Sequence, residues 1–372
     1  MIKEVIKNIF EKLLYIKAEI TWKRHINKVY RHLGIKNSDL DTDLITKHQQ
    51  YWGQLKRKVN PKWFRVYSHI TENFDIHYVP ENIYFNIIEE KLNNRKHALA
   101  FGDKNFYEVF YDNKDIFPES IIRNIDGVFY DHAYNLLTLD DNRLKQYLSK
   151  YQKILIKPSA DSGGGKKIQL FFNKNNNFTD NQNHNLTVDY LHIHYKDNYV
   201  IQNYIRQSEF LAQFNSSSVN TIRIFTYRSV VTDEVIPLHA VLRIGKEGNY
   251  IDDQNVGGVA CRINEDSTLN DFATNYFGEK FFEFNRIVFS QVKTFPLLKE
   301  MKQLTIQLAR KNIHSRVMGF DFTINFENNI KLIEINHLWT GINFFQMNGS
   351  TVFGKYTDEV IEFCSSNKKG LN

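Results

Sequence analysis

Two runs of alternating apolar and polar residues near the C-terminus, 319–325 and 330–336, constrain the fold more than any other feature of the chain. Their period of two predicts two β-strands, and the Glu327-Asn328-Asn329 segment between them predicts an antiparallel hairpin. Since successive side chains point to opposite faces of a strand, one face of this hairpin is apolar and must belong to the core. The apolar face consists of Phe320, Phe322, Ile324, Ile333 and Ile335.

The opposite face of the same hairpin carries two carboxylates and an amide. With Asn328-Asn329 at the tip, Asp321 lies opposite Asn336 and Thr323 lies opposite Glu334. Asp321, Glu334 and Asn336 then project to one side. Two carboxylates on one face repel each other, and Mg²⁺ prefers oxygen ligands of this kind. The three residues predict a magnesium site, and a hairpin face open to solvent is the alternative.

A glycine-rich segment between two predicted strands is the second candidate site. The strands are 153–157 and 168–172, and Ser162-Gly163-Gly164-Gly165 lies between them. Glycines let backbone N–H groups approach phosphate oxygens closely, and Lys157 at the end of the first strand can neutralise the same charge. The spacing is not that of a Walker A loop. Phosphate binding and an ordinary hairpin turn both fit this pattern.

Together the two features resemble the ATP-grasp superfamily, in which a lysine-bearing strand and a glycine loop cover the nucleotide phosphates and an Asp…Glu-x-Asn set holds magnesium. Asp321…Glu334-x-Asn336 has the order and spacing of that set. The segment 200–205 is similar to the hinge strand that binds adenine, and Asp103-Lys104-Asn105 is similar to the start of the nucleotide domain. The resemblance covers residues 100–350 and implies an α+β fold in which two lobes clamp ATP.

Three further segments look like the sugar-transfer-associated ATP-grasp family of polysaccharide biosynthesis, namely 219–224, 240–245 and 255–258. The resemblance implies a role for each matching residue. It assigns Lys104, Lys157, Ser162, Gly163, Gly164 and Gly165 to the ATP phosphates, Gln202, Asn203, Tyr204 and Ile205 to adenine, Arg223 and Arg243 to catalysis at the transferring phosphoryl group, and Asn255, Gly257 and Gly258 to the acceptor. An ion pair within the sheet is the alternative role for each arginine. Because the hinge lacks the glutamate that many ATP-grasp enzymes have there, Glu209 is assigned to the ribose.

Charge separates the N-terminal region from the rest of the chain. Residues 1–66 hold 15 Lys and Arg against 6 Asp and Glu, whereas the remaining residues hold 33 against 36. Residues 2–20 have the period of an amphipathic helix with lysines on its polar face. We therefore expect a basic, mainly helical region at 1–66, a connecting segment at 67–99, and two ATP-grasp lobes at 100–200 and 201–372.

The basic helix can pack on the body of the protein or lie on an anionic membrane surface. Nucleic acid is not expected as a partner, because no recognised motif accompanies the charge. No run of about 18 apolar residues predicts a transmembrane helix, and lysines interrupt the N-terminus too often for a signal peptide. Two cysteines, Cys261 and Cys364, cannot form a disulfide framework. We expect a cytoplasmic protein with peripheral contact at the inner face of the membrane.

The resemblance implies an ADP-forming ligase that uses ATP and Mg²⁺. ATP would phosphorylate a carboxylate, and an amine would displace phosphate from the acyl phosphate. The expected partners are small-molecule carboxylate and amine substrates, glycan precursors among them. The specific expectation is amide formation on a sugar acid or amino acid in surface polysaccharide biosynthesis. A kinase acting on a hydroxyl and a non-catalytic binding or scaffold protein are the two alternatives.

Overall fold

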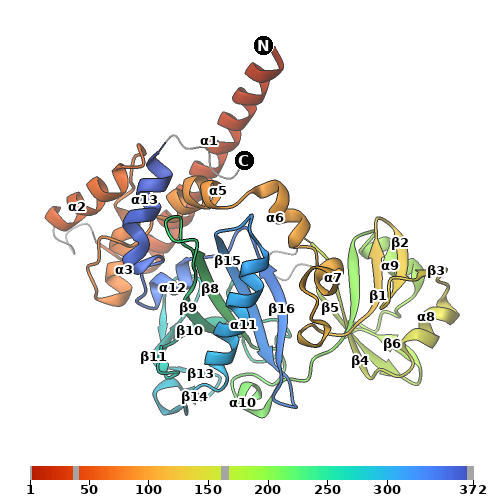
Figure 1. Cartoon of the computed structure of the whole chain (residues 1–372). Coiled ribbons are helices and arrows are strands. Elements are labelled where there is room, and N and C mark those ends of the chain that lie inside the picture. The colour runs from red at the N-terminus through yellow and green to blue at the C-terminus, as the bar shows by residue number, and fades with distance from the viewer. Residues whose placement is uncertain (1, 37–41, 161–166, 367–372) are drawn as a thin grey trace.

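The computed structural model describes residues 2–36, 42–160 and 167–366, with the backbone alone for residues 2–12. The chain begins with a helical region (Figure 1). Its elements are α1 (Ile2–His32), α2 (Thr42–Gly53), α3 (Lys62–Thr71), α4 (Glu81–Ile83), the π-helical segment η2 (Tyr84–Ile88), α5 (Glu89–Leu92) and α6 (Arg95–Phe101). Ile26 and Val29 of α1 pack with Phe64 and Tyr67 of α3 in a buried cluster. No helix within the described ranges is long and apolar enough to cross a lipid bilayer.

A first antiparallel sheet occupies the right-hand part of Figure 1. Its strands, in spatial order, are β3 (Leu136–Leu137), β2 (Val128–Asp131), β1 (Ser120–Ile125), β7 (Tyr199–Asn203), β4 (Lys153–Pro158), β5 (Gln169–Lys174) and β6 (Asn177–Thr179). Helices α8 (Asp141–Leu148) and α9 (Val188–His194) supply Leu144, Leu148 and Leu191 to the core of this sheet. The strand that ends in the predicted adenine hinge, β7, is therefore central, because it pairs with both β1 and β4.

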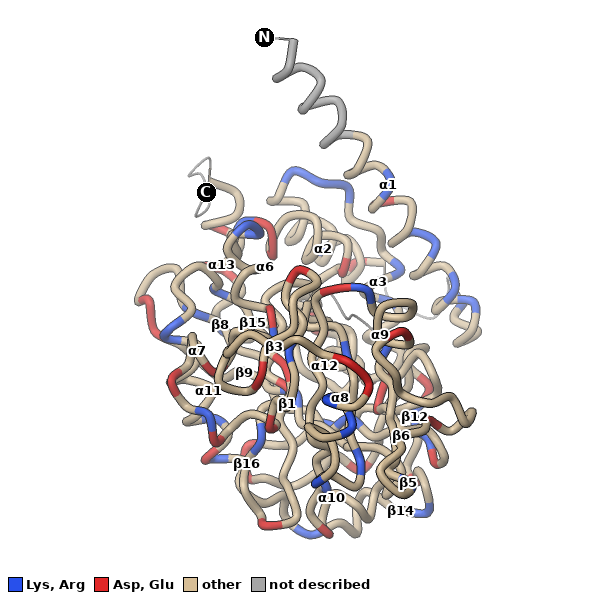
Figure 2. Tube along the Cα trace, turned by 90° about the vertical axis from the view of Figure 1, so that its right-hand side faces the viewer, with Lys and Arg blue, Asp and Glu red and all other residues tan. Residues whose placement is uncertain are grey.

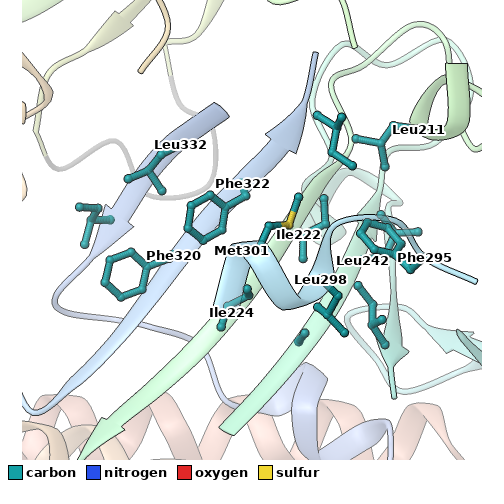
Figure 3. Packing of buried hydrophobic residues seen from close by; sticks show 14 of the residues in the cluster. Leu211, Ile222, Ile224, Leu242, Phe295, Leu298, Met301, Phe320, Phe322 and Leu332 are labelled. Carbon is teal, nitrogen blue, oxygen red and sulfur yellow. The ribbon is translucent and has the colours of Figure 1, made fainter. Parts of the chain in front are cut away.

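A second antiparallel sheet contains the C-terminal hairpin. Its order is β12 (Lys280–Phe281), β11 (Leu269–Thr274), β10 (Val259–Ile263), β9 (Val235–Ile244), β8 (Thr221–Arg228), β15 (Val317–Ile324) and β16 (Ile330–Asn336). Helix α11 (Leu298–Lys311) covers one face of this sheet (Figure 3). Phe320 and Phe322 of the hairpin pack there with Leu298 and Met301. The apolar face that the alternation predicted is thus buried under α11.

The other face of the second sheet packs against helices from both ends of the chain. Tyr84 of η2, Phe225 and Tyr227 of β8, Phe345 of α12 (Asn343–Met347) and Val360 of α13 (Thr357–Ser365) belong to one buried cluster. The remaining short elements are η3 (Lys104–Phe106), α7 (Tyr107–Tyr111), η4 (Lys114–Ile116), α10 (Glu209–Ala212), η6 (Gln254–Val256), β13 (Glu283–Phe284), β14 (Ile287–Val288), η7 (Phe289–Gln291) and η8 (Gly354–Tyr356). The helical region is therefore part of the core of the second sheet.

The register of the hairpin differs from the predicted one by two residues at Gly319–Asp321 and by three residues from Phe322 to the tip. Asp321 pairs with Glu334 and Gly319 pairs with Asn336, so the predicted pairing of Asp321 with Asn336 was wrong. A shift of two preserves the alternation of faces. A bulge next to Asp321 leaves Ile333 without a paired position. Ile333 consequently turns toward a cleft instead of the predicted core, and Leu332 takes its place in the core.

Candidate active site

A cleft with a volume of about 310 Å³ lies between the two sheets. Strands β4 and β7 line one wall, and β8, β9, β15 and β16 line the other. One group of its lining residues is apolar or aromatic: Pro118, Leu155, Ile168, Tyr204, Ile205, Val219 and Ile333. A second group consists of charged and amide side chains, so the cleft has the mixed lining of a small-molecule site.

The predicted adenine hinge, residues 202–205, lines the cleft throughout. The Asn203 N–H donates to the carbonyl of Glu119 at 2.9 Å, and the Tyr204 N–H donates to the carbonyl of Lys153 at 3.2 Å. Buried Gln202 donates through Nε2 to Ser120 Oγ at 3.3 Å. Its Oε1 has no hydrogen-bond partner among the described residues. An unpaired buried acceptor is costly, so a donor on a bound ligand would be stabilising there.

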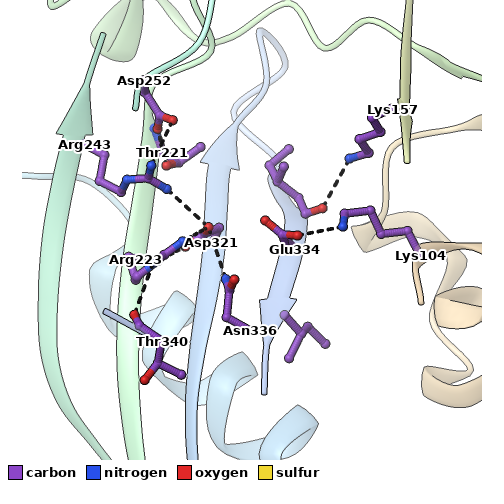
Figure 4. A network of polar contacts seen from close by, with 12 residues as sticks. Lys104, Lys157, Thr221, Arg223, Arg243, Asp252, Asp321, Glu334, Asn336 and Thr340 are labelled. Carbon is purple, nitrogen blue, oxygen red and sulfur yellow. Dashed lines mark hydrogen bonds and ion pairs between the residues drawn. The ribbon is translucent and has the colours of Figure 1, made fainter. Parts of the chain in front are cut away.

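Two lysines enter the cleft from the first sheet and the segment before it. Lys104 is 5% exposed, and its Nζ donates to Glu334 Oε1 at 2.6 Å. Lys157 is 3% exposed, and its Nζ donates to the Ile333 carbonyl at 3.4 Å. Figure 4 shows both ammonium groups directed at β16. Both predicted phosphate-binding lysines therefore meet the predicted metal hairpin.

Burial and like charge shift the ionisation of these groups. Burial, followed by the nearby Lys104 charge, lowers the pKa of Lys157 to about 7, although Glu334 opposes the shift. Burial acts to raise the pKa of Glu334, but the charge and hydrogen bond of Lys104, together with the charge of Lys157, hold that pKa below its usual value. Glu334 is therefore ionised near neutral pH, while Lys157 is close to half protonated.

Asp321 and Arg223 form a buried ion pair between neighbouring strands. Arg223 Nε donates to Asp321 Oδ1 and Nη2 donates to Oδ2, both at 2.5 Å. Arg223 Nη1 also donates to the Thr340 carbonyl at 3.3 Å. Burial acts to raise the pKa of Asp321, but the Arg223 charge lowers it overall. Two parallel charged hydrogen bonds fix the carboxylate more firmly than a single contact would.

Arg243 lies between the carboxylates of Asp321 and Asp252, and its contacts with them are longer than those of Arg223 with Asp321. Its Nη1 is 3.4 Å from Asp321 Oδ2, and its Nη2 is 3.5 Å from Asp252 Oδ1. Asp252 also accepts hydrogen bonds from the N–H and the hydroxyl of Thr221. Burial raises the pKa of Asp252 in spite of Arg243. Of the two arginines in the cleft, Arg243 therefore has the weaker contacts with protein carboxylates.

The hairpin donors suit a hard divalent cation. Asp321 and Glu334 occupy paired positions, where Cβ atoms are about 4.5–5.5 Å apart. Asn336 Nδ2 lies 3.4 Å from Asp321 Oδ2, and all three residues line the cleft. Glu334 is 28% exposed through its side chain, and each carboxylate oxygen has a second lone pair beside its bonded arginine or lysine. Two carboxylates and an amide form an oxygen set of the kind Mg²⁺ uses, so these residues fit that ion.

The predicted acceptor residues divide into one lining residue and two supporting glycines. Asn255 lines the cleft, whereas Gly257 and Gly258 do not. A Cβ on Gly258 would lie 2.8–3.0 Å from three backbone oxygens, and Gly257 has φ +94°. Only glycine fits these two positions without strain. The pair therefore holds the 250–255 loop against the end of β9, which a substrate-contacting role would not require.

Two other sets of assigned residues are not among the described lining residues of the cleft. Glu209, predicted to bind ribose, is an exposed residue at the start of α10. The proposed function therefore gives Glu209 no role. Ser162, Gly163, Gly164 and Gly165 lie outside the described residues.

Several cleft residues were not predicted from the sequence. They are Thr221, Tyr250, Asp252, Asp253, Gln254, Tyr276, Trp339, Asn343 and Phe344. The adjacent carboxylates Asp252 and Asp253, placed just before a Gly-Gly turn, were a visible signal. No comparable signal marked Tyr276 or Trp339, because their approach to the cleft depends on packing between distant segments.

Two lobes that enclose a cleft with a lysine-bearing strand and an Asp…Glu-x-Asn hairpin define the ATP-grasp class of proteins. A family model described as sugar-transfer associated ATP-grasp matches residues 86–360, and the chain belongs to this family. The predicted α+β ATP-grasp fold with a helical N-terminal region is confirmed. No curated protein matches the chain by sequence.

The solved structures similar to this chain include a ligase, a synthetase and a carboxylase. ATP-grasp ligase PsnB, complexed with a phosphomimetic precursor variant, Mg and ADP, is 13% identical with a TM-score of 0.37, over 73% of this chain and 61% of that chain. D-alanyl-alanine synthetase A from Vibrio cholerae is 14% identical with a TM-score of 0.39, over 73% and 67%. Biotin carboxylase from Campylobacter jejuni is 12% identical with a TM-score of 0.41, over 72% and 47%. The chain thus spans about three fifths of the length of PsnB.

Proposed function

We propose that the protein is an ADP-forming carboxylate–amine ligase that uses ATP and Mg²⁺ and acts through an acyl phosphate. One observation carries the proposal: a single cleft combines an apolar end, two buried lysines and three oxygen donors on one hairpin face. A pocket with convergent polar groups and a strongly shifted lysine pKa is typical of an active site. We infer that two lobes close to the expected ranges 100–200 and 201–372 enclose it, with the boundary after β7, since Ile201 and Gln202 pair within the first sheet.

ATP lies along the cleft, with adenine at the apolar end against residues 202–205. The phosphates extend past Lys157 and Lys104, whose ammonium groups neutralise them. Residues 162–165, which lie outside the described part of the chain, keep the phosphate-binding role that the sequence predicts for them. This placement is supported by the shared approach of both lysines to the carboxylate of Glu334.

Asp321, Glu334 and Asn336 would hold magnesium, which when bound polarises and orients the γ-phosphoryl group. Arg243 contacts the transferring phosphoryl group, because its ion pairs at 3.4 and 3.5 Å leave its charge available. Arg223 is held by two bonds to Asp321 and acts by positioning that carboxylate. This role agrees with the alternative of an ion pair within the sheet and replaces direct contact with phosphate.

The reaction has two steps. A carboxylate oxygen of the substrate attacks the γ-phosphorus, the bond to the bridging oxygen breaks, and ADP leaves. The amine nitrogen then attacks the acyl carbon, the acyl–oxygen bond breaks, and phosphate leaves with the proton released by nitrogen. The protein residues bind and orient both partners in a cleft that limits access of water.

Hydroxylamine trapping tests the ligase against its alternatives. With ATP, Mg²⁺, hydroxylamine and a panel of sugar acids and amino acids, the protein is expected to release ADP and form a hydroxamate. A kinase would release ADP with a hydroxyl substrate and form no hydroxamate. A protein that neither releases ADP nor binds ATP in calorimetry is a scaffold, and the proposal is then wrong.

ATP binding is expected to take up about one proton through Lys157 and to weaken as the pH rises. In the free protein the pKa of Lys157 is lowered to about 7, and phosphate charges favour its protonated form. Binding is then independent of this group below pH 7 and falls by up to tenfold per pH unit above it. Calorimetry at pH 8 in buffers of different ionisation enthalpy measures the proton uptake. Lys157→Gln should abolish it; equal uptake in both proteins contradicts the assignment.

The finer substrate assignment is supported by the family description, sugar-transfer associated. We infer that a sugar acid or amino acid is joined to an amine in surface polysaccharide biosynthesis. Such work draws on the ATP and small precursors of the cytoplasm. Cys261 and Cys364 are both free and buried, which suits a reducing compartment.

The basic helix α1 supports contact of the protein with an anionic membrane surface. Leu13, Leu14, Ile16 and Ile20 are each 45–58% exposed. Basic residues are distributed along the described part of the helix (Figure 2). The exposed Lys17, Lys23 and Arg24 are among them. The acidic side chain of Glu19 faces the body instead, where it accepts hydrogen bonds from Asn82 and Asn86. Exposed apolar side chains among basic ones are typical of helices that lie on anionic lipid.

Reversing three charges on α1 is expected to weaken binding to anionic vesicles by at least about 100-fold, because each basic residue near such a surface contributes about 1 kcal/mol. The variant is Lys17→Glu/Lys23→Glu/Arg24→Glu, and co-sedimentation with phosphatidylserine vesicles measures the binding. Lys145→Glu/Lys174→Glu/Lys196→Glu makes the same change in net charge at exposed positions of the first lobe. Equal loss in both variants, or equal binding to neutral vesicles, contradicts a membrane face on α1.

A further inference from the structure

The loop after the metal hairpin places an exposed tryptophan at the cleft. Trp339 follows Asn336 by three residues, lines the cleft and is 57% exposed. The other three tryptophans are half-buried or buried, with Trp52 at 0% and Trp63 at 2% exposed. A large aromatic side chain left open in a cleft is an unusual use of apolar surface. Its position beside the proposed reacting centre indicates a ligand contact.

The backbone at Trp339 is held in an unfavourable conformation. Its φ is +56°, in the left-handed region that bulky residues avoid. Glu89, which is 1% exposed, accepts hydrogen bonds from the Trp339 N–H at 3.1 Å and the Thr340 N–H at 3.3 Å. The hydroxyl groups of Tyr84 and Thr340 form a hydrogen bond with an oxygen–oxygen distance of 2.7 Å. Strain that buried partners impose in this way is characteristic of functional positions.

The supporting element is itself irregular. Tyr84 and Phe85 belong to the π-helical segment η2, and the Phe85 ring stacks on Trp339 with centroids 5.4 Å apart. Single π-helical turns inside α-helices are frequently found at functional sites. Arg95 of α6 also lies over the indole, with its guanidinium carbon 5.7 Å from the ring centroid. The helical region thus orients the indole through Phe85 and Arg95, and 57% of the residue remains exposed. This arrangement is independent of the metal hairpin and of both lysines.

Trp339 lies on the acceptor side of the reacting centre. Thr340 accepts a hydrogen bond from Arg223, and Figure 4 shows it across Asp321 from Lys104 and Lys157. The nucleotide occupies the lysine side in the proposed function. A substrate carboxylate that attacks the γ-phosphorus must approach from the opposite side, because attacking and leaving oxygens are in line. The rest of that substrate then extends toward Trp339.

We propose that Trp339 is a specificity-determining platform on which the ring of a sugar acid stacks while its carboxylate faces Arg243. The apolar C–H face of a pyranose matches the flat indole, and the amide of Asn343 in the same cleft can bind a hydroxyl group. A small or acidic amino acid such as glycine or glutamate has no ring face to stack on the indole. This inference rests on the proposed ligase function and selects the sugar acid as its carboxylate substrate.

Intrinsic fluorescence tests the contact directly, since Trp339 is the most exposed of the four tryptophans. With ADP and Mg²⁺ present, D-glucuronate and D-galacturonate are the probes, and glycine and L-glutamate are the amino acid comparison. We expect at least one sugar acid to protect the wild type from acrylamide quenching by about twofold or more. Trp339→Phe should show little quenching and no protection. Protection by the amino acids alone, or by no probe, overturns the proposal.

Kinetics separate substrate contact from a structural role. In the hydroxamate assay with the protecting sugar acid, Trp339→Ala should raise KM about tenfold and leave kcat within about twofold, and Trp339→Phe should restore most of the affinity. Phe326→Ala, at another exposed aromatic position, should change neither value. An unchanged KM in Trp339→Ala overturns the proposal. Calorimetric ATP binding distinguishes the cases: its absence in the wild type defeats the ligase function, whereas intact ATP binding with an unchanged KM defeats only the platform.

Discussion

Arg223→Met is expected to lower the free energy of unfolding by about 3–5 kcal/mol, the range measured when one partner of a buried ion pair is removed. Asp321 is 3% exposed and would lose both of its 2.5 Å hydrogen bonds. Arg243 and Asn336 would still donate to Asp321 Oδ2, but their hydrogen bonds of 3.4 Å are too long to compensate for the two that are lost. Urea unfolding followed by circular dichroism measures the change.

The same strand offers a matched control. Arg228 of β8 also forms two hydrogen bonds with an aspartate, but Asp233 is 57% exposed through its side chain. Arg228→Met should cost only about 0–1 kcal/mol, because solvent screens the charge that remains. Equal losses in the two variants would show that the Arg223 effect comes from lost packing. Arg223→Met/Asp321→Asn should recover part of the loss, because no buried charge is then left unpaired.

The pH dependence of the Arg223 effect has a defined sign. The pKa of Asp321 is lowered in the folded protein, since Arg223 outweighs the effect of burial. The stability gained from the pair is therefore present above the ordinary aspartate pKa and is lost as the pH falls through the lowered value. The difference between wild type and Arg223→Met should shrink in acid. A difference that grows below pH 4 contradicts this account.

Glu334→Gln is expected to reduce Mg²⁺-dependent ADP release by about 10²–10³-fold, as loss of one preorganised charge contact in an active site does. The substitution keeps the shape of the side chain and one acceptor for Lys104 while it removes a charge from the proposed metal set. The substitution relieves the repulsion between Glu334 and Asp321 but also weakens the ion pair of the buried Lys104, so circular dichroism of the variant must first show that it is folded. Coupled-enzyme detection of ADP measures the rate.

Calorimetry with and without Mg²⁺ shows where the loss in Glu334→Gln arises. ATP binding in the presence of EDTA should be similar in wild type and variant, whereas the gain on adding Mg²⁺ should vanish in the variant. Glu327→Gln, at the exposed tip of the same hairpin, is the control and should behave as wild type. An unchanged magnesium dependence in Glu334→Gln would remove the hairpin from the proposed metal site.

The β15–β16 hairpin shows which features of a strand pair can be predicted from the local alternation of residues. Alternation alone placed Asp321, Glu334 and Asn336 on one face, and that face lines the cleft. The register was wrong by two residues at Asp321 and by three nearer the tip, because a bulge and the 325–329 turn depend on packing against β8 and α11. The three polar residues kept their common face because two residues are one full period of a strand. The odd shift beyond the bulge moved Ile333 from the predicted core face to the cleft.

The sequence by itself determined the elements whose period and composition are local: the strands, the C-terminal hairpin with its apolar and acidic faces, the two lysines and the basic helical region. Tertiary structure alone decided which charges meet. It paired Arg223 with Asp321 and Lys104 with Glu334, kept Glu209 out of the cleft, and brought Trp339 against Phe85 across more than 250 residues. The physical reason is that periodicity is set by neighbours along the chain, whereas ion pairs and clefts form where buried surfaces from distant segments pack and leave polar groups that must satisfy one another.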